Sequence, residues 1–482
     1  MRGGRSVAIV IALLCTGCAG LPPKQRPAPL QNEVPLDGVE AAGGGDWPAK
    51  EWWKRYQDPT LDELIELGLA SSPTLATAHA RYDSARQSVR IAGAESGVRV
   101  DASADTDRQR LSDNGLIPPR LLGFTWYNQS DLGLQASYTF DWWGKHRDAV
   151  EAAMDQAHAA QADRSAAALT LATSIADTYF GWQADQSRIA LARERAGMVE
   201  REGAIAGARV RAELDAAENT DRSSLDLAAA REQIAALEGS AKLRAVALAA
   251  LVGRSLAELP ALQPKPLPAL SGNLPDAVKI DLISRRADIT ASRWRVEAAE
   301  RNADSARAEF FPDVSINVLL GLSSVDVGKL IEYGSRVPQA SAAIHLPIFD
   351  AGRLKARYGA TQAAIDSAVA SYRDTLVGAA RDVAMQASTR AQIAAQRTQR
   401  LIEVEAARQL HGSAAARVRQ GIVDARTELA ASEAWIVQRD ALLQLDAEAL
   451  SADIALQRAL GGGYERPQKL ANSPSTATTT TQ

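Results

Sequence analysis

The sequence predicts a mainly helical protein with a small β part, in which long coiled-coil helices continue a transmembrane β-barrel that three chains share. Three observations lead to this fold class. Two stretches, 97–143 and 311–352, alternate apolar and polar side chains with the period of two that strands show. Long proline-free stretches with apolar residues at heptad spacing accompany them. The pattern near Phe140 recurs 209 residues later at Phe349, which indicates an internal two-fold repeat.

Composition and charge narrow the classes of function. The chain has 482 residues and a net charge of −4, so it lacks the basic footprint of nucleic-acid-binding proteins. Hydrophobic residues make up 46% of it but aromatic residues only 5%, and such an excess of small side chains suits close helix packing. The five histidines are scattered, and no P-loop or GxSxG motif occurs. We therefore expect no catalytic residues, no metal and no cofactor.

The first 17 residues are expected to be a signal peptide. Two arginines precede a short apolar run, residues 7–14, which is too short to span a bilayer as a helix. The run leads into LCTGC, which resembles the bacterial lipobox, so we expect Cys18 to become the acylated first residue of the mature chain. The alternative is an ordinary signal peptide with an incidental cysteine. Residues 18–50, rich in proline and glycine, are expected to form a lipid-anchored linker.

Residues 51–254 form the first expected repeat. It opens with a helical pattern that carries a proline in its first turn, where proline is tolerated. Two strands are expected, at about 98–107 and about 131–141, and a long helix follows from near Gly144. That helix should fold back near Gly203–Asp215. Beyond the turn, apolar residues recur every seven positions, at Leu227, Ile234, Ala241 and Leu248.

A proline-rich linker, 255–275, leads to the second expected repeat, 276–461. Its strands are expected at about 312–323 and about 339–349, before a long helix that should fold back near Gly412–Asp424. This helix shows the 4-3-4-3-4 spacing of a coiled-coil seam, at Ile365, Val369, Tyr372, Leu376, Ala379 and Val383. Residues 462–482 end in a threonine-rich run and are expected to be a disordered tail.

Strand number and helix length together predict how chains assemble. Each long helix is expected to hold about 60 residues, or roughly 90 Å, and must project through water because it contains no apolar run of membrane-spanning length. Four membrane-type strands cannot close a barrel, and an open sheet edge is not tolerated in lipid. Eight strands from two chains would be filled by their own side chains, whereas twelve strands from three chains would leave a channel. We therefore expect a homotrimer with one 12-stranded barrel.

Several short motifs resemble those of a known family, the trimeric outer membrane factors of Gram-negative efflux pumps, similar to TolC and OprM, in the lipoprotein branch often called NodT-like. The resemblance covers nearly the whole chain after Cys18. Its carriers are Trp52 with Asp58-Pro59, Leu61, Leu64 and Ile65, and the runs SRRADI (284–289), AEFFP (308–312), PIFDAGR (347–353) and ALGGG (459–463). The sequence departs from the family at Ala287, where proline is usual. It departs again at Glu213, where the first turn lacks the glycine that the second turn keeps as Gly421.

The resemblance implies a passive exit duct in the cell outer membrane for small molecules and drugs. Its implied partners are two further copies of the chain, outer-membrane lipid, a periplasmic adaptor (membrane fusion protein) and an inner-membrane transporter that supplies the energy, with no nucleic acid. Two alternatives remain. One is the outer-membrane duct of a type I protein secretion system, which uses the same architecture. The other is a coiled-coil lipoprotein tether without a pore, which would not need the alternating strands.

The two turns between the long helices are the candidate functional site. In a trimer, six such turns would meet at the periplasmic mouth, and they carry Arg209, Arg211, Asp215, Arg417, Arg419, Gly421 and Asp424. The resemblance implies that the adaptor docks there, and Gly421 would permit close backbone approach. Ion pairs among these residues would also hold the mouth shut, the alternative being solvated helix ends. An acid/base pair of Asp215 and Asp424 is disfavoured, because the sequence indicates no enclosed pocket.

Overall fold

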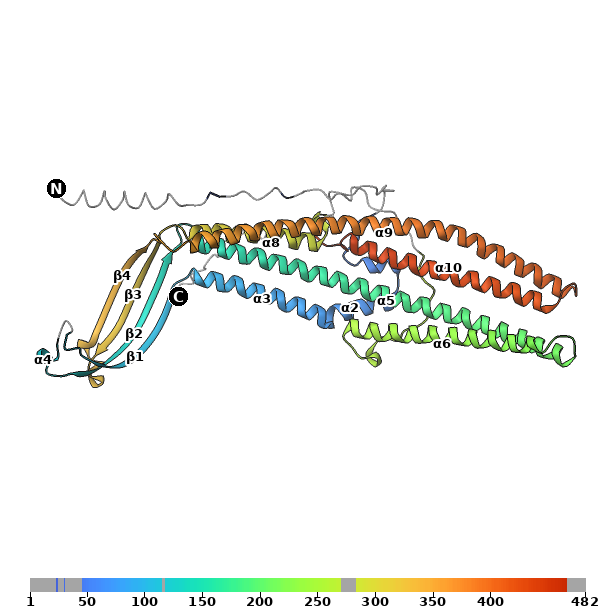
Figure 1. Ribbon diagram of the computed structural model, residues 1–482, viewed down its shortest axis with the longest axis horizontal. Helices are drawn as coiled ribbons and strands as arrows, with labels where there is room; N and C mark the ends of the chain where they lie inside the picture. Colours follow the sequence, from blue (N-terminus) through green and yellow to red (C-terminus); the bar gives the residue numbers. More distant parts are fainter. Residues whose placement is uncertain (1–22, 25–29, 31–45, 115–117, 270–282, 466–482) are drawn as a thin grey trace, which may run out of the picture. The chain divides into compact units, whose positions relative to one another are not determined.

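A computed structural model describes residues 23–24, 30, 46–114, 118–269 and 283–465 of the chain. The chain divides into two compact units. The first comprises residues 1–30, 81–160 and 292–372, and the second comprises residues 31–80, 161–291 and 373–482. Figure 1 shows their helices and strands. The expected signal peptide, Cys18 and most of the expected C-terminal tail lie outside the described residues.

The first unit contains one antiparallel sheet with the strand order β1-β2-β3-β4 (Figure 1). The strands are β1 (Arg99–Arg110), β2 (Trp126–Phe140), β3 (Asp313–Ser324) and β4 (Arg336–His345). The first repeat supplies β1 and β2 and the second supplies β3 and β4, so the pairing of β2 with β3 joins the two repeats. The four expected strands therefore exist and lie in a single sheet.

The register of the sheet separates an apolar face from a polar one. Leu134 of β2 lies opposite Ala102 of β1 and Leu320 of β3, and the expected apolar residues continue this row at every second position. Leu319 breaks the alternation because its side chain lies on the polar face. Gly133 accommodates it, since a Cβ atom at Gly133 would lie only 3.0 Å from the Leu319 side chain. The alternation expected from the sequence is confirmed.

Two strand boundaries differ most from those expected. β2 begins at Trp126 rather than near residue 131, because its first residues continue the ladder with β1. Tyr127 lies opposite Gln109 there and donates a 2.9 Å hydrogen bond from its hydroxyl to the Gln109 side chain. β4 ends at His345 rather than near residue 349, because Pro347 has no N–H to donate to a ladder.

The long helices show the internal repeat directly. The helix α5 (Lys145–Arg211) and the helix α9 (Arg353–Arg419) each have 67 residues, a length of about 100 Å. The helices that return from their turns, α6 (Glu218–Val252) and α10 (Ala425–Ala459), each have 35 residues. The shorter helices are η2 (Trp52–Tyr56), α2 (Pro59–Ser71), α3 (Pro73–Glu95), α4 (Pro119–Leu122), η3 (Leu256–Glu258), α8 (Ala287–Ala308), η4 (Val327–Lys329) and η5 (Tyr333–Ser335). Within the described ranges, no helix combines the length and the apolar character that a membrane span requires.

The core of the second unit forms where α2 packs against α5, α6 and α10. Leu61, Leu64 and Ile65 of α2 are fully buried in a cluster that includes Ile175 of α5 and Leu248 of α6. Burying a large aliphatic side chain contributes about 1.5–3 kcal/mol, so this cluster fixes the bases of both helical hairpins. The coiled-coil seam expected in α9 is confirmed, because all six of its residues are buried: Ile365, Val369, Tyr372, Leu376, Ala379 and Val383.

Candidate functional site

The two turns of the second unit, 212–217 between α5 and α6 and 420–424 between α9 and α10, lie next to each other (Figure 1). Ion pairs between α5 and α10 position the hairpins that carry them. Arg188 forms a bidentate pair with Asp440 at 2.8 and 3.1 Å, and Arg195 lies 2.7 Å from Glu433. The helices extend through Gly203 and Gly412, so each turn is shorter and lies further along the chain than the sequence suggested.

Both long helices end in the same hydrogen-bond pattern. In the first turn, the N–H of Leu214 donates to the carbonyl of Arg209 at 2.9 Å, and the N–H of Glu213 donates to that of Val210 at 3.0 Å. In the second turn, Ile422 donates to Arg417 at 3.0 Å, and Gly421 donates to Val418 at 2.9 Å. This is the Schellman motif, which requires a left-handed residue directly after the helix.

The left-handed position is the main difference between the two turns. Gly421 occupies it in the second turn with φ of 70°, which a glycine adopts without strain. Glu213 occupies it in the first turn with φ of 60°, although a left-handed conformation costs a residue with a Cβ atom about 1–2 kcal/mol. The helix that follows is also better capped in the second turn, where the Asp424 side chain accepts from the N–H of Arg426 at 3.0 Å. Ala217 holds the N-cap position of α6 and provides no side-chain acceptor.

Four charged side chains connect the two turns. Arg209 binds Asp215 through two hydrogen bonds, of 2.9 Å from Nε and 3.1 Å from Nη2. Arg426 lies 3.4 Å from Asp215 and 3.2 Å from Asp424, and Arg209 lies 3.9 Å from Asp424. These four residues, which we call the charge ring, alternate in sign and close on themselves. The ring brings together three residues expected from the sequence and adds Arg426, which sequence reasoning missed.

The ring stabilises the ionised form of both carboxylates. The side chain of Arg209, which donates to Asp215, lowers the pKa of that carboxyl below its ordinary value of 3.8, and the nearby charge of Arg426 adds to the effect. The backbone N–H of Arg426 is the main cause of the lowered pKa of Asp424. Both carboxylates therefore remain charged throughout the neutral and mildly acidic range. Because the ring is exposed to solvent, dissolved salt screens it.

The remaining expected residues lie outside the ring. Among the described residues, Arg211, Arg417 and Arg419 have no carboxylate partner within ion-pair distance. Within the second turn, Asp424 pairs with Arg426 and not with Arg417. Two exposed apolar residues follow the left-handed positions, Leu214 at 64% and Ile422 at 61% exposure. Each turn thus presents an apolar side chain together with guanidinium groups that form no ion pair among the described residues, although Arg419 donates to the carbonyl of Ala415 at 3.4 Å.

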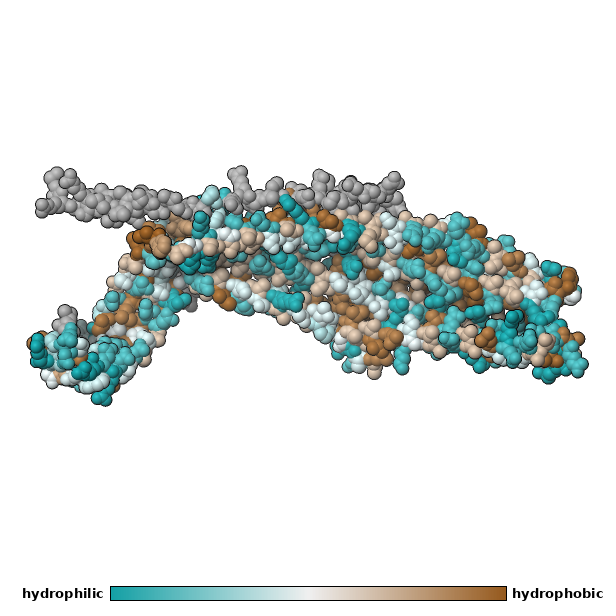
Figure 2. Space-filling view, in the orientation of Figure 1, coloured by the Kyte–Doolittle hydropathy of each residue, from teal (hydrophilic) through white to brown (hydrophobic). Residues whose placement is uncertain are grey.

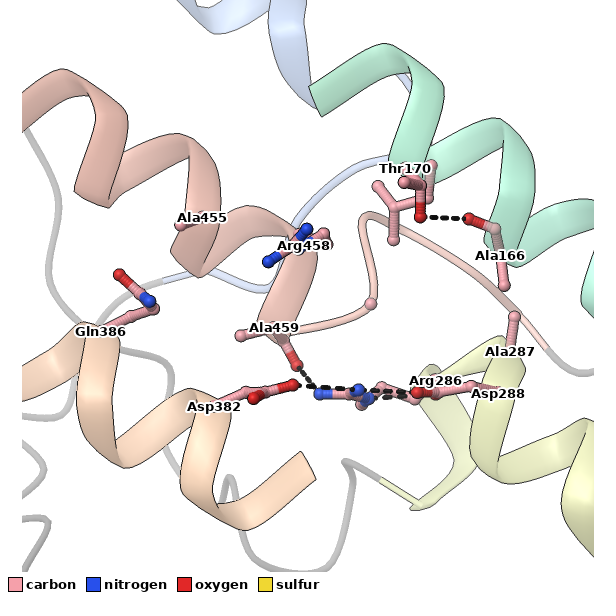
Figure 3. Close-up of a pocket in the computed structure, with 12 residues that line it drawn as sticks. Ala166, Thr170, Arg286, Ala287, Asp288, Asp382, Gln386, Ala455, Arg458 and Ala459 are labelled. Atoms are coloured by element: carbon pink, nitrogen blue, oxygen red, sulfur yellow. Dashed lines mark hydrogen bonds and ion pairs between the residues drawn. The ribbon is translucent and has the colours of Figure 1, made fainter. Parts of the chain in front are cut away.

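A second polar cluster lies around Arg286, in the SRRADI motif (Figure 3). The Arg286 side chain is buried and donates to both oxygens of Asp288, at 3.0 and 2.6 Å, and to the carbonyl of Ala459 at 3.1 Å. Asp382 of α9 lies 3.5 Å away on its other side. Burial alone would lower the pKa of Arg286, but the hydrogen bonds that it donates to Asp288 and the charges of Asp288 and Asp382 outweigh burial and raise the pKa.

The cluster explains two motifs that sequence reasoning left without a role. Arg286 satisfies a carbonyl at the end of α10, where the three glycines of ALGGG follow. All three have positive φ, and a Cβ atom on Gly461 would collide with the carbonyl of Arg285. The adjoining cavity, about 240 Å³, is lined by α5, α9, α10 and the start of α8. Because Arg286 pairs with Asp288 and Asp382 and donates to the end of α10, the cluster joins these helices.

No group of histidine, cysteine and carboxylate side chains suited to a metal ion occurs among the residues that the structure describes. The turns combine left-handed residues, exposed apolar side chains and ion pairs.

Comparison with known proteins assigns the chain to a family. The model of the family described as "Outer membrane efflux protein" matches residues 64–254 and 280–462, and thus matches both repeats. The chain is 32% identical over 463 residues to the multidrug resistance outer membrane protein MdtP of Escherichia coli K12, covering 94% of each chain. It is 31% identical over 472 residues to the putative multidrug resistance outer membrane protein MdtQ of Shigella flexneri, covering 95% of this chain and 97% of that protein.

Solved structures agree with this assignment. The outer-membrane channel OprN superimposes with a TM-score of 0.82 at 26% identity, covering 92% of this chain and 98% of that one. The outer membrane protein VceC of Vibrio cholerae superimposes with a TM-score of 0.78 at 31% identity, covering 87% of this chain and all of the other. With its four-stranded sheet, its paired long helices and its internal repeat, the chain belongs to the outer membrane efflux protein family.

Proposed function

We propose that this chain is the outer-membrane exit duct of a tripartite efflux pump, and that three copies share one barrel. The observation that carries the proposal is the sheet. One of its faces is apolar and the other polar, as a lipid surface and a water-filled lumen require. Its edge strands β1 and β4 each pair on one side only within the described chain. A sheet with free edges cannot lie in lipid, so further copies must complete it.

The cargo class follows from the relatives, which are named multidrug resistance outer membrane proteins. We infer that the duct conducts small molecules, including drugs, from the periplasm outwards, with energy from an inner-membrane transporter. A tether without a pore would have no use for the sheet.

We propose two roles for the turns. The exposed apolar residues Leu214 and Ile422, with the unpaired Arg211, Arg417 and Arg419, provide a surface for a periplasmic adaptor. The charge ring fastens the two turns of one chain together and so restricts the mouth of the resting duct. Adaptor binding that competes for Arg209 or Arg426 would release it.

We also propose that Cys18 carries the lipid anchor. Mass spectrometry of the mature N-terminus should find a diacylglyceryl thioether and an acylated α-amine on this residue. Cleavage elsewhere, or an unmodified residue 18, would refute the anchor and leave the duct proposal standing, because the barrel supplies its own membrane affinity.

The duct itself is tested by mass and conductance. The protein extracted in gentle detergent should have the mass of three chains and should conduct ions in planar bilayers. Ile316→Arg places a charge on the apolar face and should cost about 2–4 kcal/mol near the bilayer midplane, so it should reduce assembly strongly. Ser315→Arg, on the polar face of the same strand, is the matched control and should assemble. A folded, membrane-inserted monomer, or a trimer without conductance, would overturn the proposal.

A further inference from the structure

The end of the sheet that leads into the long helices exposes a group of apolar side chains. Ile348 is 92% and Phe349 90% exposed between β4 and α9, and Trp142 is 67% exposed between β2 and α5. Trp142 continues the apolar face of the sheet, because its ring lies 5.7 Å from that of Phe140, which in turn lies 5.0 Å from Tyr138. Figure 2 shows hydrophobic surface at this junction. Aromatic side chains in such a position mark the level at which a barrel leaves the hydrocarbon.

Exposed cations follow directly in the first turns of both helices. We call four of them the basic collar: Arg147 of α5, and Arg353, Lys355 and Arg357 of α9. The three arginine side chains are 58–68% exposed. Each has one carboxylate within reach, Asp148 at 3.4 Å, Asp350 at 3.9 Å and Glu309 at 3.2 Å respectively.

Two of these pairs are loose, at 3.4 Å for Arg147 and 3.9 Å for Arg353, whereas Arg357 and Glu309 are paired at 3.2 Å. Asp350 already accepts from the N–H groups of Gly352 and Leu354, and Asp148 is buried. Among the described residues, Lys355 has no ion pair. Cations in the first turn of a helix also oppose the helix dipole, so the helices gain nothing from them there. Lys355, and Arg147 and Arg353 in their loose pairs, can therefore accept a further anion close to the exposed apolar group.

The N-terminal segment gives an independent indication of the membrane level. The Tyr358 hydroxyl donates to the carbonyl of Pro23 at 3.2 Å, and Lys24 lies 2.6 Å from Asp304 of α8. Pro23 is thus held at Tyr358, the residue that follows Arg357 of the collar. Four residues lie between Pro23 and Cys18, and the five residue steps reach at most roughly 18 Å. An acyl chain on Cys18 can enter a bilayer only if that bilayer lies close to this level.

We propose that the basic collar binds the phosphate groups of anionic phospholipids in the periplasmic leaflet of the outer membrane. The apolar group formed by Trp142, Ile348 and Phe349 seats the acyl region beside it. The inference rests on the proposed outer-membrane orientation. It adds a preference for anionic over zwitterionic lipid, which a barrel with an aromatic girdle alone would not show. Its cause is the attraction of several guanidinium and ammonium groups to a surface of phosphodiesters.

The test is native mass spectrometry of the intact assembly with added phosphatidylglycerol or phosphatidylethanolamine. The unmutated protein should retain phosphatidylglycerol preferentially, and salt should weaken the preference. The variant Arg147→Gln/Arg353→Gln/Lys355→Gln/Arg357→Gln should bind phosphatidylglycerol at least tenfold more weakly. A matched control, Arg201→Gln/Arg222→Gln/Arg231→Gln/Lys242→Gln, removes four exposed cations from α5 and α6 and should keep the preference. Millimolar glycerol phosphate should not compete, because it lacks the acyl chains.

Equal retention of the two lipids by the unmutated protein, or an undiminished preference in the collar variant, would overturn the inference. Displacement by glycerol phosphate would reassign the collar to free phosphate. If the quadruple collar variant does not assemble, Lys355→Gln alone, which breaks no ion pair, replaces it. This single variant should still lower phosphatidylglycerol binding measurably. Unchanged binding would refute the collar. Conductance of the same samples distinguishes failure of the collar from failure of the proposed duct. A conducting channel without lipid preference contradicts the collar and leaves the duct proposal standing.

Discussion

The two turns of the second unit reach the same backbone geometry by different means. The second turn follows local preference, with Gly421 in the left-handed position and Asp424 as the N-cap of α10. The first turn places Glu213 in the same conformation and starts α6 without a side-chain cap. What it has instead is the bidentate pair of Arg209 with Asp215. The contrast indicates that the second turn is favoured by its local sequence, whereas the first depends on charges.

Removal of Asp215 should have the largest effect on this contrast. Asp215→Asn deprives Arg209 of its two charge-assisted hydrogen bonds and Arg426 of one of its two carboxylates. Hydrogen exchange of the backbone amides at 209–217 should accelerate about tenfold, with little change at 417–424. Arg211→Gln, a neighbouring cation without an ion pair, serves as the control. Equal acceleration at 209–217 and 417–424 would show that the first turn depends on charges no more than the second turn does.

Exchanging the left-handed residues should have an intermediate effect of opposite sign in the two turns. Gly421→Glu should destabilise the second hairpin by about 1–2 kcal/mol, because it adds a Cβ atom at positive φ. Glu213→Gly should stabilise the first hairpin by up to about 1 kcal/mol, after the greater chain entropy of glycine is subtracted. Thermal unfolding of the two variants measures both changes in stability. A first turn destabilised by glycine would mean that the Glu213 side chain contributes a contact that outweighs its backbone strain.

Acidification should have the smallest effect over the ordinary range. The folded-state pKa values of Asp215 and Asp424 are lowered, so the stabilisation by the ring is fully present above the unfolded value of about 3.8 and is lost as pH falls through the folded values. Exchange at 209–217 should therefore be nearly constant between pH 7 and pH 5, after correction for intrinsic rates, and should rise below pH 4. A transition near pH 6 would point to a different titrating group.

Sequence patterns predicted the elements whose cause is local. The seam from Ile365 to Val383 is buried as expected, since heptad spacing alone places those residues on one side of a helix. The apolar and polar faces of the sheet were predicted correctly as well, because alternation alone places successive side chains on opposite faces of a strand. Arg426 was missed because its partner Asp215 is 211 residues away in sequence and becomes a neighbour only when the hairpins pack. Glu213 was recognised as lacking the family's glycine, but its left-handed conformation was not predicted, because a residue with a Cβ atom does not indicate positive φ.

The position of the turns shows the same difference between features with a local cause and features that depend on packing. Gly203 and Gly412 suggested earlier turns, yet both lie within the long helices, where packing overrides the low helix propensity of glycine. The role of SRRADI and ALGGG was visible only in three dimensions, since Arg286 reaches a carbonyl 173 residues further along the chain. Both cases concern contacts between elements, about which a single sequence contains little information.

The most direct test of the account is the resting conductance of the reconstituted protein in planar bilayers. Arg209→Gln/Arg426→Gln removes both cations of the charge ring, and Arg211→Gln/Arg417→Gln removes two cations of the same turns that have no ion pair. We expect a higher resting conductance for the ring variant than for the unmutated channel, and high salt should produce part of the same rise in the unmutated channel. The control variant should conduct like the unmutated channel. Identical conductance in all three proteins at every salt concentration would contradict a duct whose mouth is restricted by the ring.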